Sequence, residues 1–261
     1  MDAPLIEFQS VTKAFGDNVV LDGVDLTILR GEVTAVIGKS GEGKSVLLKH
    51  IIGLMRPDSG QILFQGRPIT AYSKTERREL KRKFSYMFQG TALFDSMTIW
   101  ENIALPLKET LRLPVAEIQT RVRDKMAQLD LDGIDAQYPS QLSGGMQKRV
   151  ALARALVTEP EIVLFDEPTT GLDPIRKHAV HQMISDYQRR FGFTAVVVSH
   201  DIPGIFHIAQ RVAMLDEGRI CFQGTPAALQ QSALPAISAF IGPKAFEPSQ
   251  ENGAQASGER T

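Results

Sequence analysis

"VTAVIGKSGEGKSVLLKHIIGLM", residues 33–55, begins with a short apolar run rich in β-branched residues and continues into a glycine-rich loop. The segment after the loop carries apolar residues at helical spacing, namely Leu47, Leu48, Ile51 and Leu54. The loop itself, residues 38–45, reads "GKSGEGKS" and fits the pattern G-x-x-x-x-G-K-[ST]. Because the pattern stands between a buried strand and an amphipathic helix, as it must, the stretch predicts a phosphate-binding loop on an α/β sheet.

This phosphate loop combines three kinds of phosphate ligand. Its glycines let successive backbone N–H groups surround a β-phosphate without a Cβ in the way. Lys44 brings a positive charge to the β and γ oxygens, and the Ser45 hydroxyl is suited to Mg²⁺. We therefore expect a nucleotide to be bound by the whole loop, which consists of Gly38, Lys39, Ser40, Gly41, Glu42, Gly43, Lys44 and Ser45.

Two carboxylates follow a second apolar strand, in "IVLFDEP" (residues 162–168). Ligands of open α/β sheets bind at the carboxyl ends of the strands, so this acidic pair is expected to meet the phosphate loop. Adjacent strand residues point to opposite faces, which predicts different roles for the two acids. Asp166 would reach the magnesium shell, and Glu167 would accept the proton of an attacking water. The alternative is two solvated acids before a proline turn.

Two further polar residues end comparable strands. Gln89 follows "SYMF" and has a carbonyl oxygen suited to a metal or a water, and His200 follows "VVVS" and can hydrogen-bond a γ-phosphate oxygen. Taken singly, each is more often structural, but their coincidence at one sheet edge favours function. The predicted catalytic set is therefore Glu167, His200 and Gln89, and the predicted metal set is Ser45, Gln89 and Asp166.

A third segment, "LSGGMQKRVALARALV" (residues 142–157), places Ser143, Gly144 and Gly145 before a helix that starts basic and turns apolar. We call these three residues the signature segment. A helix start leaves backbone N–H groups unpaired at the positive end of the helix dipole, which makes it an anion site. The alternative is that Ser143 is an ordinary N-cap.

The remaining sequence predicts the layers around these segments. Residues 5–28 alternate apolar and polar residues around a turn and predict an antiparallel β layer, whereas alternating apolar strands and helices predict a parallel sheet. A helical subdomain is expected over about 91–158, a closing hairpin is expected to turn at Glu217-Gly218, and residues 243–261, rich in Gly, Ser, Pro and Gln, are expected to form a flexible tail.

Composition restricts the partners and the compartment. The 261 residues carry a formal net charge of -1, which gives no broad attraction to nucleic acid, so no nucleic-acid partner is expected. Cys221 is the single cysteine, which excludes an internal disulfide and fits a reducing compartment. The start "MDAPLIEFQS" has no signal-peptide pattern, and no apolar run approaches the ~18 residues of a membrane span. We expect a cytoplasmic protein.

The order of these motifs resembles the ATP-binding cassette (ABC) proteins over residues 5–242, with "LSGGMQ" as the most specific element. The resemblance implies a P-loop NTPase ABC cassette, with a RecA-like parallel sheet core, an antiparallel β edge layer and a helical subdomain. It implies Mg²⁺ held through Gln89 and Asp166, Glu167 as general base and His200 as the switch histidine. Phe15 would stack on adenine, and Asp173, in "TTGLDP", would link two active sites.

The resemblance also implies a second copy of the chain. In two-fold dimers of such cassettes, each ATP lies between the phosphate loop of one chain and the signature segment of the other. ATP would hold the dimer closed, and hydrolysis would open it. The segment "GTALFDSMTIWENIALPL" would then carry the motion to a permease dimer, through an apolar groove that includes Phe94, Met97 and Trp100, unless those residues are core.

Finer matches resemble the ATPase subunits of Mla-type, MCE-associated phospholipid transporters of Gram-negative bacteria, including Val46 where most relatives have Thr. A departure is Met146-Gln147, where that subgroup often has Arg after Met. The resemblance implies a permease dimer, an MCE protein and a small STAS-domain protein as partners. It also implies phospholipid moved between inner and outer membranes, and a location on the cytoplasmic face of the inner membrane.

Two other functions remain open at this point. One is the ATPase subunit of an importer for an amino acid or another small solute, because the cassette does not read the cargo. The other is a soluble cassette ATPase acting in translation or DNA repair. Those proteins usually carry two cassettes or a long coiled-coil insertion, and this chain has neither.

Overall fold

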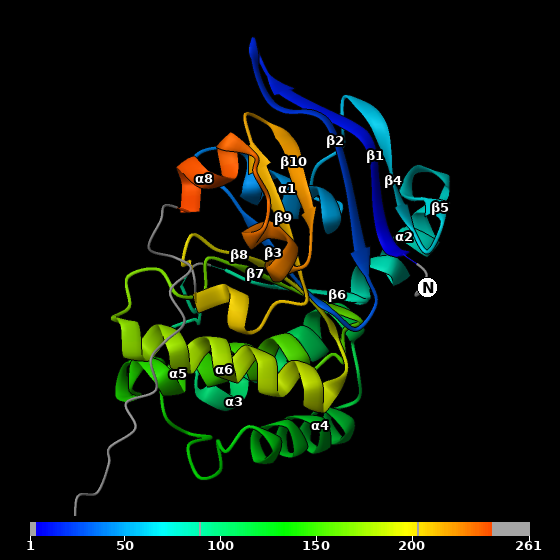
Figure 1. The fold of residues 1–261 in the computed structure, drawn as a ribbon. Helices are drawn as coiled ribbons and strands as arrows, with labels where there is room; N and C mark the ends of the chain where they lie inside the picture. Colours follow the sequence, from blue (N-terminus) through cyan, green and yellow to red (C-terminus); the bar gives the residue numbers. More distant parts are fainter. Residues whose placement is uncertain (1–3, 89, 203, 242–261) are drawn as a thin grey trace, which may run out of the picture.

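The computed structural model describes residues 4–88, 90–202 and 204–241. Within them the chain forms a six-stranded sheet, a four-stranded sheet and a group of helices below the larger sheet (Figure 1). In this described part of the chain, no helix is both long and apolar enough to cross a membrane. The predicted tail, residues 243–261, and Gln89 lie outside the described residues.

The six-stranded sheet has the order β10-β9-β3-β8-β7-β6, and its strands are parallel except for the last hairpin pair. The predicted parallel sheet is thus confirmed, as is the hairpin turning at Glu217-Gly218. The strands of this sheet are β3 (Val33–Ile37), β6 (Phe84–Met87), β7 (Ile162–Asp166), β8 (Thr194–Val198), β9 (Arg211–Asp216) and β10 (Arg219–Gly224). The apolar strands β3 and β8 are buried along their whole length, because both faces of the sheet are covered.

The smaller sheet is antiparallel, with the order β2-β1-β4-β5, which confirms the predicted antiparallel layer. Its strands are β1 (Pro4–Phe15), β2 (Asn18–Leu29), β4 (Ser59–Phe64) and β5 (Arg67–Pro68). One face of this sheet shares a core with α1 (Lys44–Ile51) and with side chains of the larger sheet such as Val36 and Leu164. The helix of the phosphate loop is therefore enclosed between the two sheets.

The first helix is shorter than its apolar spacing predicts. It ends at Ile51, and Leu54 is 65% exposed instead of continuing the buried stripe. The cause is Gly53, whose φ of 67° is left-handed and lets the chain reverse after the last turn. The N–H of Leu54 donates to the carbonyl of Lys49, which closes the helix end.

The remaining helices are mostly on the other face of the six-stranded sheet. They are η1 (Ile69–Ala71), α2 (Lys74–Arg82), α3 (Ile99–Pro106), η2 (Leu107–Leu111), α4 (Val115–Gln128), η3 (Pro139–Gln141), α5 (Gly144–Leu156), α6 (Pro174–Phe191), η4 (Gly204–His207), α7 (Pro226–Gln230) and α8 (Pro235–Ile241). Several begin with a capping side chain, such as Ser73 at α2 and Thr98 at α3, each in a reciprocal capping box. The π-helical turn η2 is not anticipated by the sequence pattern.

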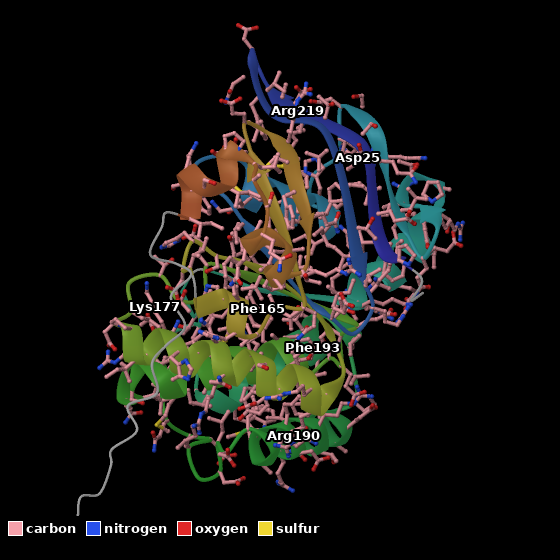
Figure 2. The ribbon with its side chains drawn as sticks, viewed as in Figure 1. Asp25, Phe165, Lys177, Arg190, Phe193 and Arg219 are labelled. Atoms are coloured by element: carbon pink, nitrogen blue, oxygen red, sulfur yellow. The ribbon has the colours of Figure 1, made fainter. Side chains whose placement is uncertain are left out.

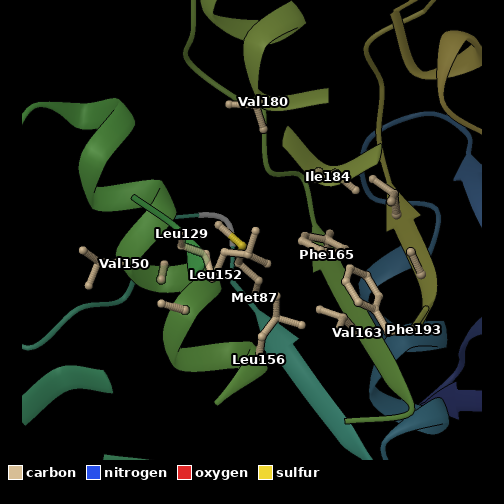
Figure 3. Packing of buried hydrophobic residues seen from close by; sticks show 14 of the residues in the cluster. Met87, Leu129, Val150, Leu152, Leu156, Val163, Phe165, Val180, Ile184 and Phe193 are labelled. Carbon is tan, nitrogen blue, oxygen red and sulfur yellow. The ribbon is translucent and has the colours of Figure 1, made fainter. Parts of the chain in front are cut away.

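Helices α3, α4, α5 and α6 share one large core with the lower face of the sheet. Leu152 and Leu156 of α5 lie beside Met87, while Phe165 of β7 lies beside Phe193 with ring centroids 6.5 Å apart (Figure 3). Burial of these large side chains fixes α5 and α6 against the strands whose ends carry the polar residues. The two cores therefore place α1 and α5 on opposite faces of one sheet.

Candidate active site

The carboxyl ends of β3, β8 and β7 meet at one edge of the sheet, because these neighbouring strands are parallel. The phosphate loop leaves β3, the acidic pair ends β7 and His200 follows β8. The structure therefore brings together these sequence-predicted groups, with Gln89 outside the described residues.

The phosphate loop has a backbone that requires glycine at two positions. Gly38 has a φ of 152°, and a Cβ there would lie 2.3 Å from the carbonyl oxygen of Leu215. Gly43 has a φ of 100°, and a Cβ there would lie 2.7 Å from Cγ1 of Val20. Both positions are left-handed or nearly so and are closely packed, so a side chain would displace the neighbouring strands.

Lys44 is folded back over this loop. Its Nζ donates to the carbonyl of Gly38 at 2.9 Å and to that of Lys39 at 2.6 Å, and the residue is only 4% exposed. Burial lowers the pKa of Lys44, and the nearby carboxylates of Glu167, Glu42 and Asp166 oppose that change. The ammonium group is thus held where a phosphate bound by the loop could replace the two carbonyls as its partner.

The outer part of the loop is more open. Ser40 and Gly41 are exposed, whereas the Glu42 carboxylate accepts the backbone N–H of Lys39 at 3.1 Å. The side chain of Lys39 reaches Asp216 at 3.4 Å, across to the end of β9. The Glu42 side chain thus holds the turn in shape, and the exposed residues are accessible to a ligand.

Asp166 joins the phosphate loop to the acidic strand. The Ser45 hydroxyl donates to its Oδ1 at 3.0 Å, and the Tyr86 hydroxyl donates to its Oδ2 at 2.6 Å. Burial and the bond to Asp166 raise the pKa of Tyr86. A hydroxyl and a carboxylate in contact form a donor set suited to Mg²⁺, which is bound by one or two carboxylates together with substrate phosphates.

Tyr86 is a partner that sequence reasoning misses. It lies in β6, which pairs in parallel with β7, so a tyrosine near the end of the strand preceding Gln89 was the available signal. The motif patterns contain no tyrosine at this position, and only the pairing of two strands distant in sequence reveals the contact.

Glu167 does not occupy the conformation that strand alternation predicts. Its φ is 49°, a left-handed value that is strained for glutamate, so the chain leaves the strand directly after Asp166. Its N–H still donates to the carbonyl of Val198, and its carbonyl accepts from the N–H of Thr170. The side chains of Asp166 and Glu167 therefore point in different directions because the chain turns at Glu167. Strand alternation, which the sequence prediction gave as the reason, is not the cause.

The Glu167 carboxylate has two neighbours. The Thr170 hydroxyl donates to its Oε2 at 2.9 Å, and Nδ1 of His200 lies 3.6 Å from the same oxygen. The turn after Glu167 is also tied to α5, because Nζ of Lys148 donates to the carbonyl of Pro168 at 2.6 Å. Thr170 and Lys148 are further contacts that the sequence motifs do not indicate.

The signature segment lies at the start of α5 on the opposite side of the sheet from α1. The Ser143 hydroxyl accepts the N–H of Met146 at 3.3 Å, so the N-cap interpretation holds, and all three residues of the segment are exposed. They border a cavity of about 890 Å³ between α5 and α6, together with Leu172 and Arg176. Capping thus leaves the outer surface of the segment accessible.

Two more predicted residues lie at the edges of these elements. Phe15, at the end of β1, is 47% exposed and has Nζ of Lys13 at 5.5 Å from its ring centroid. Asp173 caps α6, accepting the N–H of Arg176 at 3.0 Å. An exposed aromatic ring is available for stacking, whereas Asp173 is already used in part as a cap.

Comparison with known proteins agrees with this geometry. A family model described as "ABC transporter" matches residues 21–170, which include the phosphate loop, the signature segment and the acidic strand. The chain belongs to the ABC transporter family. The members of this family hydrolyse ATP to power transport, so the chain binds ATP and is the ATP-hydrolysing subunit of an ABC transporter.

Curated relatives and a solved structure refine the family membership. The chain is 38% identical over 92% of its length to the "Intermembrane phospholipid transport system ATP-binding protein MlaF" of Escherichia coli (strain K12), and covers 89% of that protein. It is also 38% identical over 93% of its length to the "Probable ribonucleotide transport ATP-binding protein mkl" of Mycobacterium tuberculosis (strain H37Rv), covering 68% of it.

One solved structure that the fold matches is cbiO1 from Clostridium perfringens, described as part of the ABC transporter complex cbiONQ. It is 30% identical, and the match has a TM-score of 0.80 and covers 88% of this chain and 92% of that one. The predicted ABC cassette fold and the resemblance to the phospholipid transport ATPases are thereby confirmed.

Proposed function

We propose that this ATPase powers the transport of phospholipid between the inner and outer membranes, as part of a Mla-type system. The observation that carries the proposal is the 38% identity to MlaF across nearly the whole of both chains, at 92% of this chain and 89% of that protein. A second MlaF, from Haemophilus influenzae, is equally similar over 89% of this chain. Such a subunit would work on the cytoplasmic face of the inner membrane.

In this proposal the residues of the edge have separate roles. The phosphate loop holds the triphosphate, Phe15 stacks on adenine, and Ser45 and Asp166 hold Mg²⁺ together with Gln89. The metal would supply positive charge to the phosphate oxygens. The contact of the Ser45 hydroxyl with Asp166, 3.0 Å, supports the pairing of these two as its ligands.

The chemistry assigned to the chain's own groups is proton transfer and positioning. Lys44 exchanges the carbonyls of Gly38 and Lys39 for phosphate oxygens and places its charge beside the transferred group. Glu167 accepts a proton from the attacking water. The Thr170 hydroxyl and the His200 ring, at 2.9 and 3.6 Å from Glu167 Oε2, restrict the direction of that carboxylate.

The proposal includes a second copy of the chain. The helices that follow the phosphate loop and the signature segment, α1 and α5, lie on opposite faces of one sheet, so we assign the two segments of a single chain to different nucleotides. A two-fold dimer provides each ATP with the phosphate loop of one copy and the signature segment of the other. Asp173, at the start of α6, would connect the two composite sites.

The membrane partners in this proposal are a permease dimer, an MCE protein and a small STAS-domain protein. The permease would dock beside α3, where Phe94 is 49% exposed and Met97 and Trp100 are half-buried. By contrast Ile99 and Ile103 of the same segment are fully buried, so they belong to the core of the helical layer. The proposed docking surface is therefore smaller than the whole segment.

An importer of a small solute is the second candidate. The similarity to mkl, whose name refers to ribonucleotide transport, supports it with the same 38% identity. The chain covers only 68% of mkl, whereas it covers 89% of MlaF, and this difference favours the phospholipid system.

The test is purification of the tagged chain from detergent-solubilised membranes, followed by mass spectrometry of the intact assembly. A permease with bound phospholipid and an MCE protein would support the proposal. A solute-binding subunit without lipid would favour the importer, and ribosomes or DNA would contradict both. A Phe94→Asp chain is the matched control, because it should lose the permease while it still binds nucleotide.

A further inference from the structure

A partly buried ionic cluster lies between α6 and the loop that carries His200. Nζ of Lys177 lies 3.3 Å from Oδ1 of Asp201, and Nδ1 of His181 lies 3.7 Å from Oδ2 of the same carboxylate. Lys177 and His181 are one helical turn apart and share a face of α6, whose N-terminal end carries Lys177 (Figure 2). The His181 side chain is 2% exposed, whereas those of Lys177 and Asp201 are 27% and 17% exposed, so the cluster is partly buried.

The Asp201 side chain is closely surrounded. A Cβ on Gly204 would lie 2.9 Å from Oδ2 of Asp201 and 3.1 Å from the His181 ring. The N–H of Asp201 donates to the Ser199 hydroxyl at 3.0 Å, and its carbonyl accepts the N–H of Ile205 at 3.1 Å. Asp201 is thus fixed through its backbone as well as its carboxylate.

The cluster connects two parts of the active-site edge. On one side Asp201 directly follows His200, whose ring lies 3.6 Å from Oε2 of Glu167. On the other side Lys177 lies in the first turn of α6, and its N–H donates to the carbonyl of Asp173, which caps that helix. A displacement of α6 would therefore shift the His200 loop through Asp201, and a displacement of that loop would shift α6 in the same way.

We infer that Lys177, His181 and Asp201 are positioning residues, which hold His200 against Glu167 and keep the Asp173 cap in register with it during ATP hydrolysis. The inference rests on the roles proposed above for His200 and Glu167. It adds a set of three residues that act through these groups and do not themselves touch the nucleotide.

The charges of the cluster indicate which contact matters most. Burial lowers the pKa of His181, with Asp201 opposing and His178, His207 and Lys177 reinforcing that shift. A neutral ring leaves Lys177 as the positive partner of the Asp201 carboxylate. Removal of either charge would leave its partner partly buried without compensation, and the loop would shift.

The experiment measures steady-state ATP hydrolysis by full-length protein purified from detergent-solubilised membranes with its bound partners. For Asp201→Asn and Lys177→Met we expect kcat to fall about 10-fold, because small misplacements of reacting groups are costly, while KM for ATP stays within about two-fold. The double variant should lose no more than the worse single variant, because the two residues act as a unit. Lys177→Arg should recover most of the loss.

The matched control is Arg189→Met, which removes an exposed ion pair with Asp186 at the far end of the same helix and should leave kcat unchanged. Unchanged kcat in Asp201→Asn would overturn the inference. A parallel loss of ATP affinity and melting temperature would also overturn it, because that result indicates a purely structural role.

A His200→Ala chain, measured alongside, distinguishes a failure of the positioning role from a failure of the role proposed for His200. If His200→Ala loses turnover while Asp201→Asn does not, the positioning role alone is wrong. If His200→Ala keeps full turnover, the role proposed for His200 is wrong and the positioning role falls with it. Loss of turnover in both, with ATP affinity retained, supports the inference.

Discussion

The phosphate loop and the signature segment both lie at the N-terminus of a helix, yet they are prepared for a ligand to different degrees. In the loop, Lys44 is 4% exposed and bonded to two carbonyls, and Glu42 holds the turn. In the signature segment, Ser143, Gly144 and Gly145 are exposed, and the capping bond to Met146 leaves their outer surface open. The phosphate loop is thus organised by contacts within its own chain, whereas the signature segment leaves its outer surface open toward the nucleotide proposed to be held by another chain.

The largest expected effect concerns the site that contains the phosphate loop and Glu167. Glu167→Gln should keep ATP binding and reduce turnover about 10² to 10⁴-fold, because the general base is lost. Single-turnover hydrolysis and nucleotide titration measure the two quantities separately. Glu109→Gln, an exposed substitution in η2, is the control. Hydrolysis by Glu167→Gln at near the normal rate would remove Glu167 from the proposed mechanism.

Lys44→Ala removes the ammonium group that the phosphate loop holds in place through the carbonyls of Gly38 and Lys39. Loss of a charge-assisted contact to phosphate should weaken ATP binding by about 1.5 to 3 kcal/mol, which is about 10 to 150-fold in affinity. Calorimetric titration of nucleotide gives the value directly. Lys49→Ala, an exposed lysine later in the same helix, should bind normally. Equal affinity of the Lys44 variant and the original chain would contradict the assignment of Lys44 as a phosphate ligand.

Ser143→Arg tests the exposed signature segment. An arginine there would occupy the surface proposed to meet the partner's nucleotide, so turnover should fall about 10-fold, or about 1.4 kcal/mol of barrier. Nucleotide binding by the single chain should change little. Ser140→Arg, three residues earlier and also exposed, is the matched control. Normal ATPase activity in Ser143→Arg would argue against a composite site.

The smallest expected effect concerns one buried histidine on each face of the six-stranded sheet, His50 of α1 and His181 of α6. Burial lowers the pKa of both from the ordinary value of 6.5. Between that value and their lower folded values, only the unfolded chain binds the proton, so the free energy of unfolding should decrease as the pH falls below 6.5.

Guanidinium denaturation at several pH values measures this decrease. His50→Gln and His181→Gln should each flatten the pH dependence, and Arg189→Met, an exposed change at the far end of α6, should not. A pH dependence that is unchanged in both buried variants would mean that other groups cause the acid loss of stability.

Much of the fold could be predicted because its signals are local. The strand before Gly38, the apolar runs of β7 and β8 and the hairpin at Glu217-Gly218 each depend on a few adjacent residues. The same holds for the phosphate loop. The end of α1 was not predicted, because the left-handed Gly53 overrides the apolar spacing that continues to Leu54.

The site was predictable in its composition but not in its contacts. Asp166 and Glu167 are evident from the sequence, yet the left-handed φ of Glu167 depends on how the chain leaves the sheet. Tyr86 and Lys148 reach the acidic segment from elements far away in sequence, through strand pairing and helix packing. Such contacts are properties of the assembled fold, and a motif pattern does not contain them.

The position of β3 has a consequence for folding during synthesis. This strand precedes the phosphate loop, but its neighbours in the sheet are β8 and β9, which are synthesised more than 150 residues later. The Leu215 carbonyl that packs against Gly38 also belongs to β9. A nascent chain therefore carries a phosphate loop without its neighbouring strands until β8 and β9 have been synthesised, and the loop reaches its folded geometry only after that point.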